Sequence, residues 1–545
     1  MEETLYLGPN SRCAALSCAV DVVYNDERGR HLRANRALPP GCVLISESPY
    51  SLTVEPVCMS FVCDNCIDTI QGNRVNCDGC DKTVYCSVAC KKQAQQRHIQ
   101  FECGLKISGF PPEMAMLGLR TLLNAPMHAI LDIYDRLKPD SDKKSLSSYG
   151  CFKEEYLNTS NELFLSIHGL IPVETLPGNP CIEDKLPLLV PPIVAQLEER
   201  KYLEMDTWPK EMDIDTRRHV TERVLIENIK RQKRNRQGAT TCPLLKQGLS
   251  VENQTILEKN GTVKASGMYP IGVLMNHSCR PNAFMSFESN GRAKTRATVA
   301  IKEGEEICQS YGPRFGNITV GRRKELLMKT YFFDCMCNAC ADPESHRIER
   351  LQCCFECSCG TPIFPSEHVC PSCNKPFVIP DDLIDSFHHL IQSIINNNHQ
   401  GTKEEFMTLV GLEKQLATVL HAHNRTLYMW REQLVNMMLD NGLFNASVES
   451  LLFNMMQTVH AAYGTESLKV GAVLKQFIRY HGGTQHLPMC QASMQQLAKL
   501  YVRYFGSKVV EQCSDQPQWK DIVKNLQSPK QFAWYEWILF DKNSV

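Results

Sequence analysis

The sequence lacks any imbalance of charge. Its 545 residues include 59 basic and 60 acidic side chains, which gives a formal net charge of −1 at pH 7. Proteins that bind nucleic acid through its phosphates need clustered positive charge. The even balance therefore argues against broad electrostatic binding to nucleic acid, and we expect no sequence-specific nucleic acid binding.

Long apolar runs are also missing. The sequence contains no stretch of about 18 consecutive apolar residues, which is roughly the length that a membrane-spanning helix needs. The opening "MEETLYLGPNSRC" carries two early acids and no basic segment ahead of an apolar run, so we predict no signal peptide. These absences favour a protein of a reducing compartment without a membrane partner.

Cysteine, in contrast, is abundant, with 27 in the chain. Disulfides are rare in a reducing compartment, so this number indicates either zinc sites or buried free thiols. One block spaces its cysteines in three pairs, followed by a histidine and a last cysteine. These candidate ligands are Cys63, Cys66, Cys77, Cys80, Cys86, Cys90, His98 and Cys103. They suffice for two tetrahedral zinc sites, each of which would supply on the order of 10 kcal/mol of folding energy.

Two further cysteine groups follow. The first, "CMCNAC", supplies Cys335, Cys337 and Cys340, and Cys279 of "NHSC" could be the fourth ligand that a tetrahedral zinc site needs. In the second group six cysteines compete for four places. They are Cys353, Cys354, Cys357, Cys359, Cys370 and Cys373. We favour a small zinc ribbon made by Cys354, Cys357, Cys370 and Cys373.

The chain is too long for one hydrophobic core, so we expect two or three domains. Short strands are predicted in the first sixty residues and again over 265–310, and mainly helices over 111–236. From Asp381 onward apolar residues recur at helical spacing, which predicts an antiparallel helical array. Its helices are expected to end near glycines that can supply a left-handed residue past the helix end, namely Gly442, Gly464, Gly482 and Gly506.

The first cysteine block resembles a MYND zinc finger. The resemblance lies in the order of the pairs, in the "YC" at Tyr85 and Cys86, and in the seven residues between Cys90 and His98. It implies interleaved pairing, with Cys63, Cys66, Cys86 and Cys90 on one ion and Cys77, Cys80, His98 and Cys103 on the other. Four residues separate His98 from Cys103 where the family usually has three.

Other motifs resemble the SET domain of protein lysine methyltransferases. They are "ERGRHLRANRALPPG", "NHSCRPN", "IKEGEEICQSYGP" and "YFFDCMCNAC". A MYND finger inserted early in a SET domain is typical of the SET and MYND domain-containing (SMYD) family. The "YGP" and "YFFDC" motifs are similar to the branch whose members usually begin with tetratricopeptide (TPR) repeats.

The resemblance implies an α+β fold. It consists of a SET-domain β-fold with an inserted MYND finger, a helical insert, a post-SET zinc cluster and a C-terminal all-α TPR-like domain. We predict the N-terminal part of the SET domain over 1–62, the finger over 63–103, a helical linker and insert over 104–264, the core SET domain over 265–315, a cysteine-rich post-SET region with the candidate ribbon over 316–376, and the helical domain over 377–545. As an insert, the finger is expected to be separable from catalysis.

The same resemblance implies an S-adenosylmethionine site. Tyr311 matches the tyrosine beside the transferring methyl group and is the predicted catalytic residue, which also touches the cofactor. The other implied cofactor-binding residues are Arg28, Gly29, Arg30, Asn276, His277, Tyr331 and Phe333. His31 stands where many members have a glycine that allows close backbone approach, so we expect it to weaken cofactor binding.

These observations predict a protein-lysine N-methyltransferase that uses S-adenosylmethionine and holds three zinc ions, or four with the ribbon. Its substrate would be a lysine of a histone or another protein, and the finger would bind proline-containing peptides of corepressor proteins. The alternative is a corepressor scaffold with weak or absent methyltransferase activity. We expect the protein in the cytoplasm and nucleus. The basic run at residues 230–236 is either a nuclear localisation signal or a solvated helix face.

Overall fold

The computed structural model describes residues 4–70, 72–80, 82–138, 141, 157–170, 185–240, 263–379, 381–397 and 400–507. The chain divides into two compact units. The first unit comprises Met1–Asn276 and Asn282–Gln309, and the second comprises His277–Pro281 and Ser310–Val545. The predicted α+β fold class is confirmed, since strands of the first unit and helices of both units make up the structure.

Three small sheets form the β-fold of the first unit. One has the order β1-β2-β12-β9, from β1 (Val20–Asn25), β2 (Gly29–Ala34), β12 (Glu306–Gln309) and β9 (Asn276–His277). A second has the order β10-β11-β3, from β10 (Ala283–Phe287), β11 (Ala293–Ala297) and β3 (Val43–Glu47). The third has the order β4-β8-β7, from β4 (Ser51–Val54), β8 (Val263–Met268) and β7 (Gln237–Thr240). Strands thus occur in both regions where the sequence predicts them.

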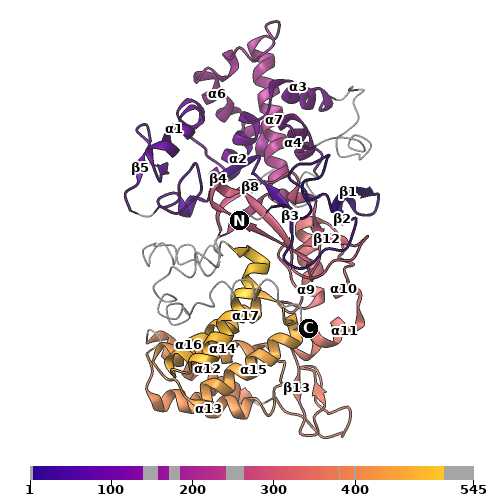
Figure 1. The fold of residues 1–545 in the computed structure, drawn as a ribbon, viewed down its shortest axis with the longest axis vertical. Helices are drawn as coiled ribbons and strands as arrows, with labels where there is room; N and C mark the ends of the chain where they lie inside the picture. Colours follow the sequence, from indigo (N-terminus) through magenta and orange to yellow (C-terminus); the bar gives the residue numbers. More distant parts are fainter. Residues whose placement is uncertain are drawn as a thin grey trace. The chain divides into compact units, whose positions relative to one another are not determined.

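Helices of the first unit gather around one long helix, α7 (Ile214–Asn235), as Figure 1 shows. Asp213 caps its first turn by accepting a hydrogen bond from the Thr216 amide at 2.8 Å. The helices that contact α7 are α2 (Pro112–Leu123), α3 (Met127–Arg136), α4 (Ser160–His168), α5 (Leu186–Leu189) and α6 (Pro191–Glu199). Their apolar faces form one core with the strands, which fixes the sheet edges that carry the candidate site.

The finger is a small loop-rich piece of the first unit. It contains the hairpin β5 (Val75–Asn76) and β6 (Val84–Tyr85), followed by α1 (Val88–Arg97). Ser87 caps α1 by accepting from the Cys90 amide at 3.2 Å. The helix then passes into a π-helical turn over His98–Glu102.

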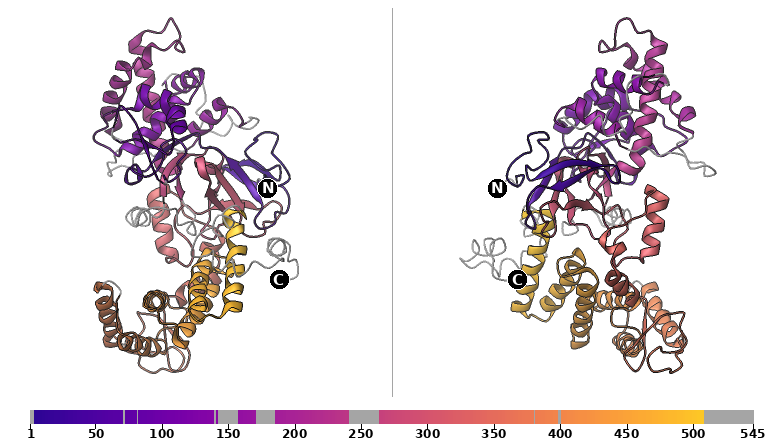
Figure 2. Two further views of the ribbon diagram at one scale, coloured as in Figure 1. Left: turned by 60° about the vertical axis from the view of Figure 1, so that its left-hand side comes forward. Right: turned by 90° about the vertical axis from the view of Figure 1, so that its right-hand side faces the viewer.

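The second unit begins with α9 (Val320–Tyr331), α10 (Asn338–Ala341) and α11 (Pro343–Leu351), followed by the hairpin β13 (Phe355–Glu356) and β14 (Pro362–Ile363). The helical array follows. Its members are α12 (Asp381–Asn396), α13 (Lys403–Leu416), α14 (Arg425–Asp440), α15 (Ala446–Tyr463), α16 (Leu468–Gly483) and α17 (Leu487–Phe505). Each helix packs against the next, which confirms the predicted array (orange to yellow in Figure 2).

Three of the four predicted helix-ending glycines are confirmed. Gly442, Gly464 and Gly506 follow helix ends with φ angles of 70°, 79° and 90°. The helix end predicted near Gly482 is also confirmed, since α16 ends at Gly483, but the left-handed residue there is Gln485, with φ 56°, and not Gly482. Among the described residues, none of the helices combines the length and the apolar character that crossing a membrane requires.

Candidate active site and metal centres

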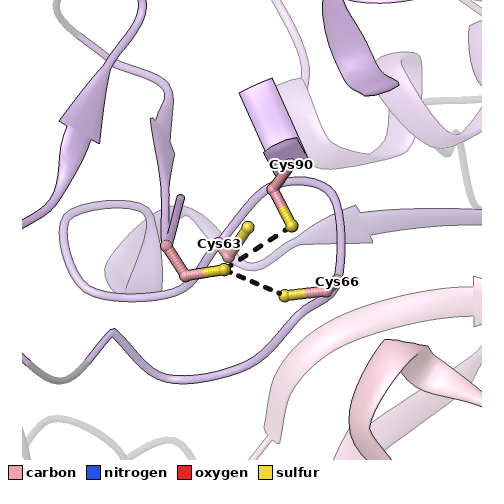
Figure 3. Close-up of side chains that lie close together, drawn as sticks. Cys63, Cys66 and Cys90 are labelled. Carbon is pink, nitrogen blue, oxygen red and sulfur yellow. Dashed lines mark hydrogen bonds between the residues drawn. The ribbon is translucent and has the colours of Figure 1, made fainter. Parts of the chain in front are cut away.

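The first metal group of the finger contains Cys63, Cys66, Cys86 and Cys90, whose Sγ atoms all lie within 4.8 Å of one another. Figure 3 shows the sulfur atoms of Cys63 and Cys66, which belong to one turn, converging with that of Cys90 at the start of α1. The Sγ atom of Cys86 lies 3.6 Å from that of Cys66 and 3.5 Å from that of Cys90. Four converging thiols are the ligand set of a structural zinc ion.

The second group contains Cys77, Cys80, His98 and Cys103. His98 Nε2 lies 3.5 Å from Cys80 Sγ, and Cys77 Sγ lies 3.7 Å from Cys103 Sγ. The π-helical turn explains how the extra residue between His98 and Cys103 is accommodated. The Cys103 amide donates to the His98 carbonyl five residues earlier at 2.6 Å, and this wider turn brings Cys103 back beside His98. The structure therefore groups the ligands as the family resemblance pairs them.

Backbone strain marks one of the metal groups. Ile67, which follows Cys66, has a φ of 62°, whereas the φ of 55° at Asn374, which follows Cys373, is one that asparagine adopts readily. A β-branched residue in the left-handed region costs about 1–3 kcal/mol and persists only where its surroundings enforce it. A metal ion bound by the preceding cysteine pair would offset that cost.

The third group joins Cys279 to Cys335, Cys337 and Cys340 within the second unit. Cys279 Sγ lies 3.5 Å from Cys340 Sγ, and the Cys279 amide donates to Cys337 Sγ at 3.4 Å. Arg323 on α9 is fully buried and donates to Cys340 Sγ at 3.6 Å and to the Ala339 carbonyl at 3.1 Å. Its guanidinium offsets the negative charge that four thiolates place around a zinc ion.

The fourth group corrects the predicted ribbon. The thiols that come together are those of Cys357, Cys359, Cys370 and Cys373, so Cys359 takes the place predicted for Cys354. Cys359 lies in the turn of the β13–β14 hairpin, and its Sγ atom is 3.6 Å from Cys370 Sγ. Cys354 is buried, and its thiol donates to the Arg350 carbonyl at 3.0 Å. It lies ahead of the hairpin and packs inward, so it cannot reach the metal position.

A buried charge network ties the finger to the rest of the first unit. Arg120 on α2 donates to Asp64 at 2.9 Å, to Glu102 at 2.8 Å and to the Leu52 carbonyl of β4 at 2.7 Å. Burial alone would raise the pKa of Glu102, but Arg120, His98 and Arg97 hold that pKa well below its usual range. Asp64 and Glu102 thus form ion pairs with arginines. Glu102 also lies 3.5 Å from Nδ1 of His98, the candidate zinc ligand, and helps to orient its ring.

Four aromatic rings of the second unit form the candidate methyl-transfer site. The Tyr311 amide donates to His277 Nδ1 at 2.9 Å, and the two ring centroids are 5.4 Å apart. The Tyr331 hydroxyl donates to the Tyr311 carbonyl at 3.2 Å, with the ring centroids 4.8 Å apart. Phe333 meets Tyr311 edge-on, at 6.5 Å between centroids. The structure thus brings together all the predicted site residues that belong to this unit.

His277 connects this cluster to the third metal group. Its Nε2 lies 3.3 Å from Cys279 Sγ, while its Nδ1 accepts the Tyr311 amide proton. Burial lowers the pKa of His277 to about 4, which keeps the imidazole neutral so that Nδ1 can accept. One side chain therefore fixes the backbone of Tyr311 relative to a zinc ligand.

The predicted site residues of the first unit form a separate group. The Asn276 amide donates to the Arg28 carbonyl at 3.2 Å and to Glu306 Oε1 at 2.9 Å, and Glu306 also forms an ion pair with Arg28. Gly29 ends the β1–β2 turn with a φ of 64°, and a Cβ atom there would meet open space. Arg30 donates to the Ser166 hydroxyl and carbonyl, each at 3.1 Å.

Sequence reasoning missed the residues that hold this group in place. The motif "GEEI" contains Glu306 but gives no sign that this residue pairs with Arg28 and Asn276. Ser166 lies in α4, a helix that carries no motif. Glu47 on β3 is buried and accepts from the amides of Ile271 and Gly272 at 2.8 and 2.9 Å, which anchors the segment that leads to Asn276. An acid at the end of the apolar strand "VLISE" is the signal that could have identified Glu47, since buried acids need partners.

His31 and the basic run also have definite places. The His31 side chain is buried, with Nδ1 3.0 Å from the Gly29 carbonyl, so the ring folds back onto its own strand. The basic run lies at the end of α7, where Arg231 is buried and donates to the His168 carbonyl at 3.1 Å. Arg231 is therefore packed against the first unit and is not part of a solvated face. A role of the run as a nuclear localisation signal stays a prediction.

Comparisons with known proteins agree with this arrangement. A family model described as SET domain matches residues 29–312, just over half of the chain. The chain therefore belongs to the SET-domain family. Together with its curated relatives, the two metal groups of the finger place it among the SET and MYND domain-containing proteins, and the tetratricopeptide branch fits as well.

Three relatives illustrate the similarity. Protein-lysine N-methyltransferase SMYD4 of Pongo abelii is 22% identical over 97% of this chain and 71% of its own length. The Homo sapiens protein of that name is 24% identical over 72% of this chain and 56% of its own length. Histone-lysine N-methyltransferase ASHR1 of Arabidopsis thaliana is 23% identical, with 80% and 82% covered. A solved SET domain of LSMT bound to lysine and AdoHcy has 12% identity, 94% coverage of both chains and a TM-score of 0.24, too low to compare folds.

Proposed function

We propose that the protein is an S-adenosylmethionine-dependent protein-lysine N-methyltransferase, which transfers a methyl group to the ε-amine of a lysine in a histone or another protein. The observation that carries this proposal is the aromatic cluster around Tyr311, held by His277, in a chain that belongs to the SET-domain family. Relatives named as protein-lysine methyltransferases support it.

The residues present fit the chemistry of S-adenosylmethionine. In the first unit, the open space at Gly29 permits close approach of a ligand to the backbone. The faces of Tyr311, Tyr331 and Phe333 suit a sulfonium cation. When bound, S-adenosylmethionine supplies an electrophilic methyl group, so no protein nucleophile is required.

The chain's own residues would prepare the lysine. A free lysine with a pKa near 10.4 needs roughly 4 kcal/mol to lose its proton at neutral pH. Burial between Tyr331 and Phe333 would disfavour the charged ammonium and exclude water. The Tyr311 hydroxyl would orient the neutral amine for in-line attack, while His277 and Tyr331 fix the Tyr311 backbone through its amide and carbonyl.

Calorimetric titration with S-adenosylmethionine tests this proposal. We expect the wild type to bind one equivalent and Asn276→Ala to bind about ten-fold or more weakly, because Arg28 and Glu306 lose their shared partner. Tyr311→Phe serves as the control, since it removes one hydroxyl and should retain the wild-type affinity. A wild type that binds no S-adenosylmethionine would instead favour the corepressor scaffold.

We also propose that the finger binds proline-containing peptides of corepressor proteins. Val88 at the start of α1 is 57% exposed and offers an apolar contact on the surface of the finger. Val88→Asp should weaken binding of a proline-rich peptide in fluorescence anisotropy. Val57→Asp is a matched control, because Val57 is similarly exposed at 52% and precedes the finger ligands. Equal binding by wild type and Val88→Asp would contradict the proposal.

Presence of the protein in both cytoplasm and nucleus stays a prediction.

A further inference from the structure

The helical array contacts the segment that carries Tyr311. Tyr463, the last residue of α15, donates its hydroxyl hydrogen to the Gly316 carbonyl at 2.8 Å. Gly316 has a φ of 78°, and a Cβ atom there would lie 2.6 Å from a carbon of the Tyr463 ring. The close approach and the left-handed backbone both require glycine. The contact therefore depends on both residues, on the Tyr463 hydroxyl as hydrogen-bond donor and on the missing side chain of Gly316.

The other end of this segment is held by the "NHSC" loop. The Tyr311 amide donates to His277, and the Phe315 amide donates to the Cys279 carbonyl at 2.9 Å. Phe315 is buried beneath the Arg280 guanidinium, whose central carbon is 3.7 Å from the ring centroid. Residues 311–316 are thus fixed by two hydrogen bonds to the loop that carries His277 and Cys279, and by one to the helical array at Gly316.

We propose that Tyr463 is a positioning residue for Tyr311. This inference rests on the proposed lysine methyltransferase function and adds a role for the helical array in it. Between Tyr311 and Gly316 lies Gly312, with a φ of 128°, whose backbone has little intrinsic restriction. Without the Tyr463 hydrogen bond the segment would sample more conformations, and the Tyr311 hydroxyl would spend less time aligned with the amine. Small misplacements of a catalytic group lower the rate without lowering substrate affinity.

The chain offers a matched pair of variants. Tyr463→Phe removes the hydroxyl that reaches Gly316 and keeps the ring. Tyr480→Phe removes a hydroxyl that lies 3.5 Å from Glu449 and makes a contact within the array only. Both changes alter an array tyrosine in the same way, so a loss caused only by a weakened array would appear in both variants.

The test measures methyl transfer to a lysine-bearing protein together with hydrogen exchange of the amides of residues 311–316. We expect Tyr463→Phe to lower kcat about three- to ten-fold, the equivalent of one lost hydrogen bond, with KM for S-adenosylmethionine unchanged. The amides should exchange faster than in the wild type and in Tyr480→Phe. Equal exchange and equal kcat in all three proteins would overturn the inference.

Failure of the proposed function would be recognised separately. If the wild type transfers no methyl group, the methyltransferase proposal fails and the catalytic role of Tyr463 fails with it, whatever the exchange rates show. If the wild type is active, Gly316→Ala provides a second variant, since its Cβ atom would displace the Tyr463 ring. A folded Gly316→Ala protein with wild-type kcat would also contradict the positioning role.

Discussion

Cys354 and Cys359 lie five positions apart in the sequence but have different environments in the structure. Cys359 belongs to the fourth metal group, whereas Cys354 donates its thiol to a backbone carbonyl. We expect Cys359→Ser to lower the zinc content by one ion per chain and Cys354→Ser to leave it unchanged, because three remaining thiols bind zinc much less tightly. Elemental analysis of both purified variants checks this. Loss of zinc in Cys354→Ser with none in Cys359→Ser would restore the ligand set predicted from the sequence.

Glu47 gives a prediction about pH. Burial raises the pKa of Glu47 from its ordinary value of 4.5 to about 8, although the hydrogen bonds from the amides of Ile271 and Gly272 act to lower it. The nearby titratable groups Cys13 and Tyr269 interact with its charge. Because the folded protein holds this proton more tightly, the contribution of Glu47 to stability is full below about pH 4.5 and is lost as pH rises towards 8.

Glu47→Gln removes that titration and is the matched control. Relative to Glu47→Gln, the wild type should lose free energy of unfolding as the pH rises from 5 to 8. Denaturant unfolding at several pH values measures it. A difference that stays constant, or that grows in favour of the wild type, would show that Glu47 is ionised throughout this range.

The candidate site residues could be predicted from the sequence where a motif fixes their neighbours. Asn276, His277, Tyr311 and the three closely spaced cysteines from Cys335 lie in short motifs whose order carries the information. Glu47, Glu306 and Arg323 could not be found in this way, because their partners are distant in sequence and only the fold brings them together. Their effect is to hold the motif residues in position.

Arg120 shows how one helix joins the finger to the sheet. It is 3% exposed and contacts Asp64 and Glu102 of the finger as well as β4. Arg120→Ala would leave two carboxylates buried without their main partner, at a cost of about 3–5 kcal/mol in the free energy of unfolding. Loss of the finger would also expose this network. Separability of the finger from catalysis stays a prediction.

Arg97→Ala is the matched control for Arg120→Ala. Arg97 contacts the same two carboxylates, at 3.2 and 2.9 Å, but its side chain is 29% exposed. Partly exposed ion pairs contribute about 0–1 kcal/mol, so this variant should lose much less stability. Denaturant unfolding followed by circular dichroism compares the two. Equal losses would contradict the view that burial makes Arg120 the principal link.

At the level of elements, periodicity predicted the array, whereas cysteine spacing and a family resemblance predicted the finger. Helices such as α12 place their apolar residues at regular spacing, and local pattern suffices for them. The π-helical turn after α1 has no such pattern, since it follows from the need to place both His98 and Cys103 on one metal. At Gly483, the last residue of α16, tertiary packing requires glycine, because a Cβ atom there would lie 2.3 Å from a carbon of the Phe444 ring.

At the scale of the whole molecule, the residues that the structure describes include four groups with the ligands of a structural zinc site. We expect four zinc ions per chain in freshly purified protein, measured by mass spectrometry of the native protein. Chelation should unfold the finger and the ribbon, because their small cores cannot replace the folding energy of the metal. A count of two or fewer would contradict the assignment of both finger sites and the Cys279 group.

Transfer of the labelled methyl group of S-adenosylmethionine to lysine tests the central claim most directly. Purified wild type and Tyr311→Phe would each be incubated with a cell lysate and the labelled cofactor, and the modified residues identified by mass spectrometry. We predict labelled lysines with the wild type and a rate lower by on the order of 10² with Tyr311→Phe, because one preorganised polar group is lost. Both incubations contain the same lysate and the same labelled cofactor, and the two proteins differ by one hydroxyl. Other lysate enzymes therefore add the same background labelling to each. Labelling by the wild type no greater than by Tyr311→Phe, with cofactor bound to both, would contradict the methyltransferase function.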